Sequence, residues 1–187
     1  MTSAAALLPE PDTGREALLL SEYVHPHWYA AYTCSNQERR VTEHLAQRSV
    51  EHFLPLYESV RRWKDRRKTL QQPLFPGYVF VRLALRDRLR ILEVPNVVRL
   101  VGFGGHPAAL PENEIEALRL SAAAHLRAEP HPYLTAGRRV RIRSGPLEGV
   151  EGILVRKKNA VRVVLSLDLI ARAAAVEVDV ADIELLS

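Results

Sequence analysis

The sequence contains a single cysteine, Cys34, among 187 residues, so neither an intrachain disulfide nor a zinc site built from several cysteines can form. It has no apolar run near the roughly 18 residues that cross a bilayer. Residues 1–26 are leucine-rich but hold one arginine against four acidic residues, whereas a secretory signal starts with positive charge. These absences predict a cytoplasmic protein in a reducing compartment, with no membrane association.

Patterns typical of catalysis, metal binding and nucleotide binding are also missing. The sequence pattern gives Cys34 no nearby base, so a lone buried thiol is the commoner case. The seven histidines show no HExxH spacing. Gly102, Gly104 and Gly105 form neither a P-loop nor a dinucleotide-binding fingerprint. We therefore expect no catalytic residue, no bound metal and no cofactor, and we do not expect an enzyme.

Positive charge is present and unevenly placed. The net charge is +4, but residues 27–127 carry 16 basic against 10 acidic side chains, whereas residues 1–26 are net negative. Such a concentration of positive charge in one segment indicates a polyanionic partner.

The alternation of apolar and polar residues predicts an α+β unit in residues 27–127. Ser35 and Glu38 have the S-x-x-E spacing of a capping box, which predicts that a helix starts there. Strands are expected at residues 27–33, 52–57, 74–83 and 97–103, and helices at residues 35–49, 87–93 and from 111 onward. The order β-α-β-β-α-β-α fits a split βαβ sheet covered by helices, as in ferredoxin-like and RNA-recognition-like folds.

The last helix of this unit begins with a cluster of acidic residues. Pro111 suits the start of a helix, and Glu112, Glu114 and Glu116 crowd its first turn. The helix dipole favours negative charge at this position, so we interpret the cluster as a helix-start signal.

A second, smaller unit follows a break in the pattern. Pro130 and Pro132 mark residues 128–136 as a linker, and short strands with glycine turns then predict a small β-barrel over residues 137–187. The alanine-rich segment 170–176 favours helix by propensity, but the neighbouring valine alternation favours strands, which we expect. Residues 1–26 show no sustained period and are predicted to be a disordered tail.

A dense basic run lies in the polar segment 58–72, which is expected to be a long hairpin tip. Cations there can neutralise phosphates while the indole of Trp63 stacks on an exposed base. The alternative is a solvated tip with Trp63 packed against the sheet. The candidate nucleic-acid-binding residues are Arg61, Arg62, Trp63, Lys64, Arg66, Arg67 and Lys68.

The most distinctive stretch is Phe75-Pro76-Gly77-Tyr78-Val79-Phe80-Val81. Strand alternation sends Phe75, Val79 and Val81 to one face and Tyr78 and Phe80 to the other. Apolar residues on both faces mean that the strand is either fully covered or displays aromatic side chains to a partner.

These stretches occur in the order seen in NusG-like transcription elongation factors, which the chain resembles over about residues 27–186. In the first unit the resemblance rests on Trp28–Tyr32, Leu74–Val81, Val94–Gly105 and Leu110-Pro111-Glu112. In the second it rests on Gly137, Val140, Ile142, Gly145-Pro146-Leu147, Gly149, the basic turn Arg156–Lys158 and Val176–Asp179. The resemblance implies an NGN domain over residues 27–127 and a Src-homology-3-like KOW barrel over residues 137–187.

The resemblance also implies that the first domain docks on the clamp helices of the largest RNA polymerase subunit. The positions that match the family's aromatic and aliphatic contact surface are Tyr32, Phe75, Tyr78 and Phe80. Such a factor promotes processive elongation and makes or breaks no bond. The basic tip would then lie near upstream DNA or the displaced non-template strand.

In the family the KOW barrel recruits either the termination factor Rho or a small-subunit ribosomal protein. The matching contact loop supplies Leu169, Ile170 and Arg172. Ile170 stands where housekeeping members usually carry phenylalanine, and Ala175 stands where they often carry proline. These departures favour a specialised, operon-restricted antitermination paralog over a housekeeping member that couples polymerase to Rho or the ribosome.

Two further interpretations remain open. An RNA-recognition module has the same element order. Its signature agrees with Gly77, Tyr78, Phe80 and Val81 but fails at Pro76, Val79 and Leu83. A ribosome-associated protein is the other, because KOW barrels also occur in translation.

Overall fold

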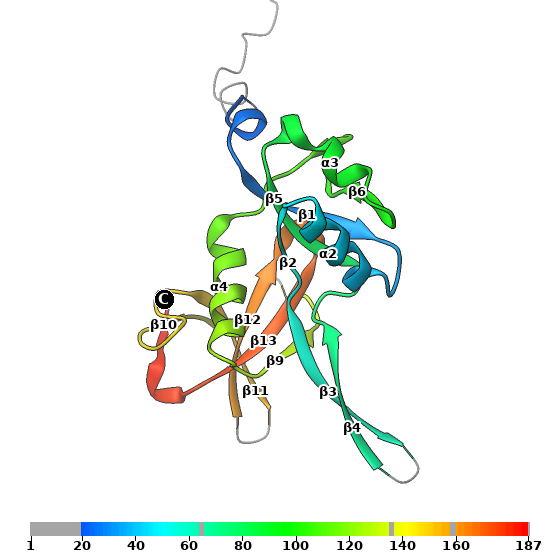
Figure 1. The fold of residues 1–187 in the computed structure, drawn as a ribbon. Helices are drawn as coiled ribbons and strands as arrows, with labels where there is room; N and C mark the ends of the chain where they lie inside the picture. The colour runs from blue at the N-terminus through cyan, green and yellow to red at the C-terminus, as the bar shows by residue number, and fades with distance from the viewer. Residues whose placement is uncertain (1–19, 64–65, 135–136, 158–159, 187) are drawn as a thin grey trace, which may run out of the picture.

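The computed structural model describes residues 20–63, 66–134, 137–157 and 160–186 (Figure 1). The first unit is built around a four-stranded antiparallel sheet in the order β2-β5-β1-β6. Its strands are β1 (His27–Thr33), β2 (Glu51–Phe53), β5 (Tyr78–Leu83) and β6 (Val97–Leu100). Within the segment predicted to be a disordered tail, residues 20–24 are helical, and residues 1–19 lie outside the described part of the chain.

Helices cover both faces of this sheet. They are α2 (Glu38–Gln47), α3 (Leu89–Leu92), which follows a 3-10 turn at Leu85–Asp87, and α4 (Glu112–Ala123). On one face, Leu45 of α2 and Ile91 of α3 are buried in a cluster with Tyr29. On the other face, Leu118 of α4 joins Phe80. None of the helices in the described residues is long and apolar enough to cross a membrane.

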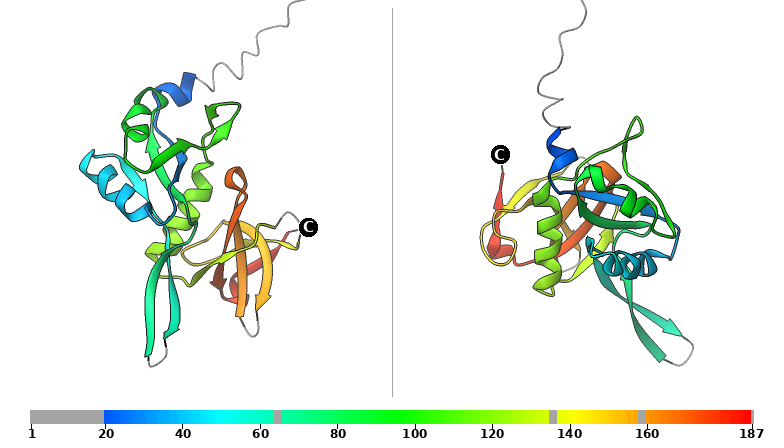
Figure 2. Two further views of the ribbon diagram at one scale, coloured as in Figure 1. Left: turned by 90° about the vertical axis from the view of Figure 1, so that its right-hand side faces the viewer. Right: turned by 45° about the horizontal axis from the view of Figure 1, so that its top comes forward.

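Two hairpins extend from the connections of the first unit. β3 (Leu56–Trp63) and β4 (Arg66–Pro73) pair along their whole length and project away from the sheet as a long arm (Figure 2). The hairpin predicted at residues 58–72 is therefore confirmed, although most of this segment is strand and not a loose tip. β7 (Gly102–Phe103) and β8 (His106–Pro107) form a second, short hairpin.

The C-terminal unit, residues 128–186, is a six-stranded antiparallel sheet in the order β14-β10-β11-β12-β13-β9. Its strands are β9 (Ala128–His131), β10 (Arg139–Ile142), β11 (Glu151–Lys157), β12 (Ala160–Leu167), β13 (Arg172–Val178) and β14 (Ile183–Leu185), with 3-10 turns at Asp168–Ile170 and Val180–Asp182. The alanine-rich segment forms strand β13, as expected. The segment predicted to be a linker contributes β9, which pairs with β13.

A buried arginine ties β9 to the rest of this sheet. Arg162 of β12 is 5% exposed, and its Nη1 donates a hydrogen bond to Oε2 of Glu129 at 2.6 Å. Its Nη2 lies 3.4 Å from Oε2 of Glu177 on β13. Because a buried cation is costly without paired anions, Glu129 anchors the β9 strand on which it lies.

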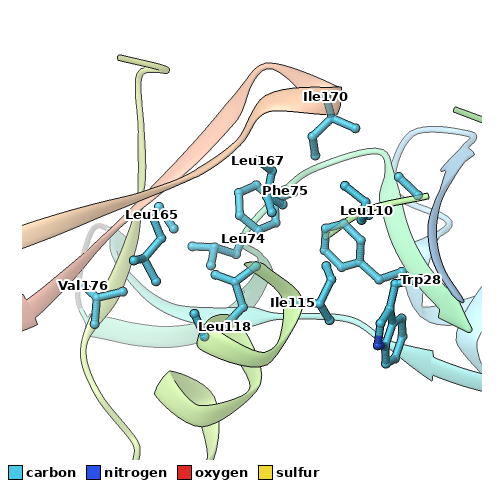
Figure 3. Packing of buried hydrophobic residues seen from close by; sticks show 14 of the residues in the cluster. Trp28, Leu74, Phe75, Leu110, Ile115, Leu118, Leu165, Leu167, Ile170 and Val176 are labelled. Atoms are coloured by element: carbon cyan, nitrogen blue, oxygen red, sulfur yellow. The ribbon is translucent and has the colours of Figure 1, made fainter. Parts of the chain in front are cut away.

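The two units share one hydrophobic core. α4 packs against β12, and a single buried cluster contains residues from both units. Figure 3 shows Leu74, Phe75 and Leu118 of the first unit beside Leu165 and Leu167 of the C-terminal unit. The predicted mixed α/β class is thus confirmed. The two predicted units are not independent domains joined by a linker alone, because they pack against each other.

Candidate functional site

The aromatic stretch begins with a tight turn that is held by a buried carboxylate. The amide of Tyr78 donates to the carbonyl of Phe75 at 3.1 Å, and Gly77 adopts a φ of +83°, a conformation that glycine allows without strain. The amide of Gly77 donates to Oε1 of Glu38 at 2.7 Å, and Glu38 is only 4% exposed. Glu38 therefore fixes the turn from which the aromatic strand starts.

This contact overturns the predicted capping box. α2 begins at Glu38, and its N-cap Gln37 makes no side-chain capping hydrogen bond. The carboxylate of Glu38 is directed to the Gly77 turn and not back to Ser35. Sequence reasoning missed this positioning role because Glu38 and Gly77 are far apart in the sequence.

The same turn changes the face on which Phe75 lies. Strand alternation predicted Phe75 with Val79 and Val81, but those two valines belong to the cluster beneath α2 and α3. Phe75 lies with Phe80 in the other cluster, with ring centroids 5.8 Å apart in an edge-to-face arrangement. The prediction was wrong because residues 74–77 form the turn, and the period of two starts only at Tyr78.

Two of the four predicted polymerase-binding residues lie at the surface. Tyr32 and Tyr78 are paired across β1 and β5, with ring centroids 5.5 Å apart. Tyr32 is 38% exposed and Tyr78 is half-buried. The guanidinium of Arg99 on β6 lies 5.8 Å from the Tyr32 ring, within the range of a cation–π contact. These three side chains form one aromatic and cationic edge of the sheet.

The other two predicted polymerase-binding residues, Phe75 and Phe80, are buried. Phe75 is 2% exposed and Phe80 is fully buried. In Figure 3, Phe75 lies beside Leu167 of the C-terminal unit, and both share a buried cluster with Ile170. The expectation that Phe75 and Phe80 are displayed to a partner is therefore wrong for this arrangement, because a second part of the chain already covers that face.

The predicted contact loop of the C-terminal unit lies in the same interface. Ile170 is 7% exposed and belongs to the shared cluster, and Leu169 packs against it. Arg172 is exposed at the start of β13. Two of the three predicted partner-binding residues thus contact the chain's own core, and only the arginine is free of that packing.

The basic run is only partly within the described residues. Lys64 lies outside them, as do the side chains of Arg61, Arg62, Trp63, Arg66 and Arg67, while Lys68 is exposed. The backbone register places Arg61 opposite Lys68 and Arg62 opposite Arg67.

The chain is similar to known proteins over most of its length. The family model described as "Transcription termination factor nusG" matches residues 26–119. The "Transcription termination/antitermination protein NusG" of Lactococcus lactis is 30% identical over 171 residues, which cover 84% of this chain and 91% of that protein. The protein of the same name from Escherichia coli K12 is 28% identical over 183 residues, or 88% and 99% of the two chains.

A solved structure shares the fold. The structure titled "Domain interaction in Thermotoga maritima NusG" aligns with 88% of this chain and 99% of its own, with a TM-score of 0.54 and 23% sequence identity. At that level of identity the likeness concerns the fold alone.

Proposed function

Because the chain belongs to the NusG family of transcription termination and antitermination factors, we propose that it is a bacterial elongation factor that binds the RNA polymerase clamp helices. In this proposal residues 27–127 are an NGN domain and residues 137–187 are a KOW domain with a Src-homology-3-like barrel. The factor acts by binding, in the cytoplasm, and promotes processive elongation.

The observation that carries the proposal is the aromatic edge formed by Tyr32, Tyr78 and Arg99. Aromatic and arginine side chains dominate the energetics of protein interfaces, and this edge is exposed while the rest of its face is covered. A clamp helix that docks there meets two rings and one cation. Phe75 joins the contact when the C-terminal unit leaves, and Phe80 supports the surface from beneath.

The long arm supplies the second proposed contact. Lys68 is exposed, and the facing cationic positions of β3 and β4 concentrate positive charge away from the sheet. We assign this arm to upstream DNA or the displaced non-template strand, where its contribution depends on salt.

The C-terminal unit favours a specialised paralog. Ile170 fills the shared core in the place where housekeeping members usually carry phenylalanine, and Leu169 packs beside it. A partner such as Rho or a ribosomal protein reaches these two side chains only after the two units separate. A pull-down with Rho and with ribosomal small subunits tests the choice, because capture of Rho would favour the housekeeping alternative.

The test is a binding measurement of the full chain to bacterial core RNA polymerase, with a polymerase that lacks the clamp helices as the negative control. Replacing both surface tyrosines, Tyr32→Ala with Tyr78→Ala, is expected to weaken binding by about 2–4 kcal/mol, or about 30- to 1,000-fold. Phe103→Ala is the matched control, because Phe103 is 72% exposed on another hairpin.

Each result has a defined meaning. Binding that depends on both the clamp helices and the tyrosine pair supports the proposal. Unchanged affinity in the folded double variant removes the tyrosine edge from the interface. Tight binding to single-stranded RNA without polymerase would instead favour an RNA-recognition module.

A further inference from the structure

A cleft of about 980 Å³ separates the polar side of α4 from the C-terminal unit. Its wall carries an excess of negative charge among the described residues. The charged side chains that line it are Glu114, Glu116, Arg139, Glu148, Glu151 and Asp168. The two units therefore meet through an apolar core on one side and through an acidic cleft on the other.

The positive charge of the cleft is already engaged. Nη2 of Arg139 donates to Oε2 of Glu151 at 3.0 Å, and Nη2 of Arg141 donates to Oε1 of the same carboxylate at 2.6 Å. On α4, Nε of Arg119 lies 4.0 Å from Oε2 of Glu116. Glu151 and Glu116 thus have cationic neighbours.

Glu114 has no such neighbour among the described residues. It lies in the first turn of α4, and its Oε2 is buried without a hydrogen-bond partner. The carboxylate that acts on it from the C-terminal unit is Asp168, whose Oδ1 accepts a hydrogen bond from the hydroxyl of Tyr133 at 3.0 Å. Two carboxylates from different units therefore face the same cleft.

This setting changes the protonation of Glu114. Burial, and then the negative charge of Asp168, raise the pKa of Glu114 to about 7. The hydrogen bond to Asp168 and the surrounding negative charge, Glu114 included, also raise the pKa of the Tyr133 hydroxyl, which stays protonated as a donor. Glu148, on the loop before β11, is a further acidic residue that lines the cleft.

We propose that Glu114 and Asp168 form a proton-dependent latch between α4 and the C-terminal unit. A proton on Glu114 allows the two units to pack, and loss of that proton sets two carboxylates against each other across the cleft and favours separation. Separation uncovers Phe75 and Ile170, the covered parts of both proposed docking surfaces. The latch depends on the packing of the two units and not on the identity of any partner.

The direction of the pH effect follows from linkage. In the separated chain Glu114 faces water, and its pKa returns toward the ordinary value of 4.5. Between these two values the packed form binds more protons, so packing weakens as the pH rises from about 4.5 to about 7 and changes little above that. For one such group, the ratio of packed to separated chains falls about tenfold from pH 6 to pH 8.

The experiment follows the distance between the two units in the full chain. Cys34 is exposed, not buried as expected from the sequence, and it is the chain's single cysteine. A second site, Val180→Cys, therefore allows a donor and an acceptor dye to be attached. Energy transfer is measured between pH 5.5 and 8.5, and the carboxyl carbon of Glu114 is titrated by NMR in the same range. We expect Glu114 to titrate with a midpoint between 4.5 and 7, and the packed fraction to fall over the same pH range.

Two variants and one control decide the result. Glu114→Gln keeps the side-chain shape without the charge, so it should stay packed at all these pH values, and Asp168→Asn should move the midpoint toward lower pH. Glu112→Gln, in the same turn but exposed, should behave like the unchanged chain. A Glu114 midpoint near 4.5, a chain that stays packed while Glu114 titrates, or an unchanged pH profile in Glu114→Gln would each overturn the latch.

Discussion

The two faces of the first sheet are covered in different ways. On one face, Tyr29 and Ala31 of β1 are sealed by α2 and α3, which the chain places between the strands of the same sheet. On the other face, Phe80 is sealed by α4, but the aromatic region beside it is covered by a separate unit that follows α4. The first cover is part of the fold of the domain. The second is a contact between two units, which separate in the proposed latch.

This difference explains why the aromatic residues of one face have different exposures. Trp28 lies under α4, where the guanidinium of Arg119 is 5.5 Å from its ring, and it is 1% exposed. Phe75 is covered by the C-terminal unit, whereas Tyr32, which contacts Tyr78 and Arg99, is 38% exposed. One face of the sheet therefore has three parts: a core under α4 that includes Trp28, a region around Phe75 that the C-terminal unit covers, and an exposed edge at Tyr32.

The largest expected effect is on the permanently covered face. Leu45→Ala removes a fully buried side chain of α2, so we expect a loss of about 2–5 kcal/mol in the free energy of unfolding, measured by urea denaturation. Leu89→Ala is the control, because Leu89 is 59% exposed and should change stability by about 0.5 kcal/mol or less. Similar losses for the two variants would contradict the assignment of this face to the permanent core.

A smaller effect is expected where the C-terminal unit covers the first sheet, and it concerns the packing of the two units and not the free energy of unfolding. Ile170→Asp places a charge in the interface, which should shift the packed-to-separated equilibrium by about 2 kcal/mol toward separation while both units stay folded. Small-angle scattering would record the larger radius of gyration, and NMR spectra would show that both units remain folded. Val180→Asp, at a residue that is 61% exposed, should leave the packing unchanged. Unfolding of the first unit in Ile170→Asp would show that the C-terminal unit is as necessary for the fold of the first unit as α2 and α3 are.

The smallest expected effect concerns β9, the strand that connects α4 to the rest of the C-terminal unit. Glu129→Gln keeps a hydrogen-bond acceptor for Arg162 but removes the charge, so we expect β9 to be less stable by about 1 kcal/mol. Hydrogen exchange of the backbone amides that pair β9 with β13 should become about fivefold faster. Glu43→Gln on the exposed side of α2 should leave those rates unchanged, and equal rates in both variants would remove Glu129 from this role.

Much of the first unit could be predicted because its signals are local. The helix after Pro111, the strand at residues 27–33 and the hairpin around residues 58–72 follow from periodicity and turn residues. The capping box failed for the opposite reason, since the partner of Glu38 is Gly77, which the sequence pattern does not connect to it. A local motif predicts only local hydrogen bonds.

The site was harder to predict than the fold. Periodicity told us that the strand after Gly77 has two apolar faces, but it does not tell what covers each of them. Glu114 was interpreted as one of three anions that complement a helix dipole, yet its neighbours Glu112 and Glu116 are exposed, whereas Glu114 is half-buried and its Oε2 is fully covered. Its different role depends on where α4 meets β12, which is a property of tertiary packing.

Strand β9 also determines how far the C-terminal unit can travel. While β9 is paired with β13, the connection after α4 is short; if it detaches, residues 124–138 become a tether whose fully extended length is about 50 Å. A tether of that size keeps the released unit at an effective concentration of the order of millimolar near the face it left. A partner that binds the surface around Phe75 or the loop around Ile170 has to compete with rebinding of the tethered unit. Weak partners therefore bind little, and only tight or locally concentrated partners remain bound.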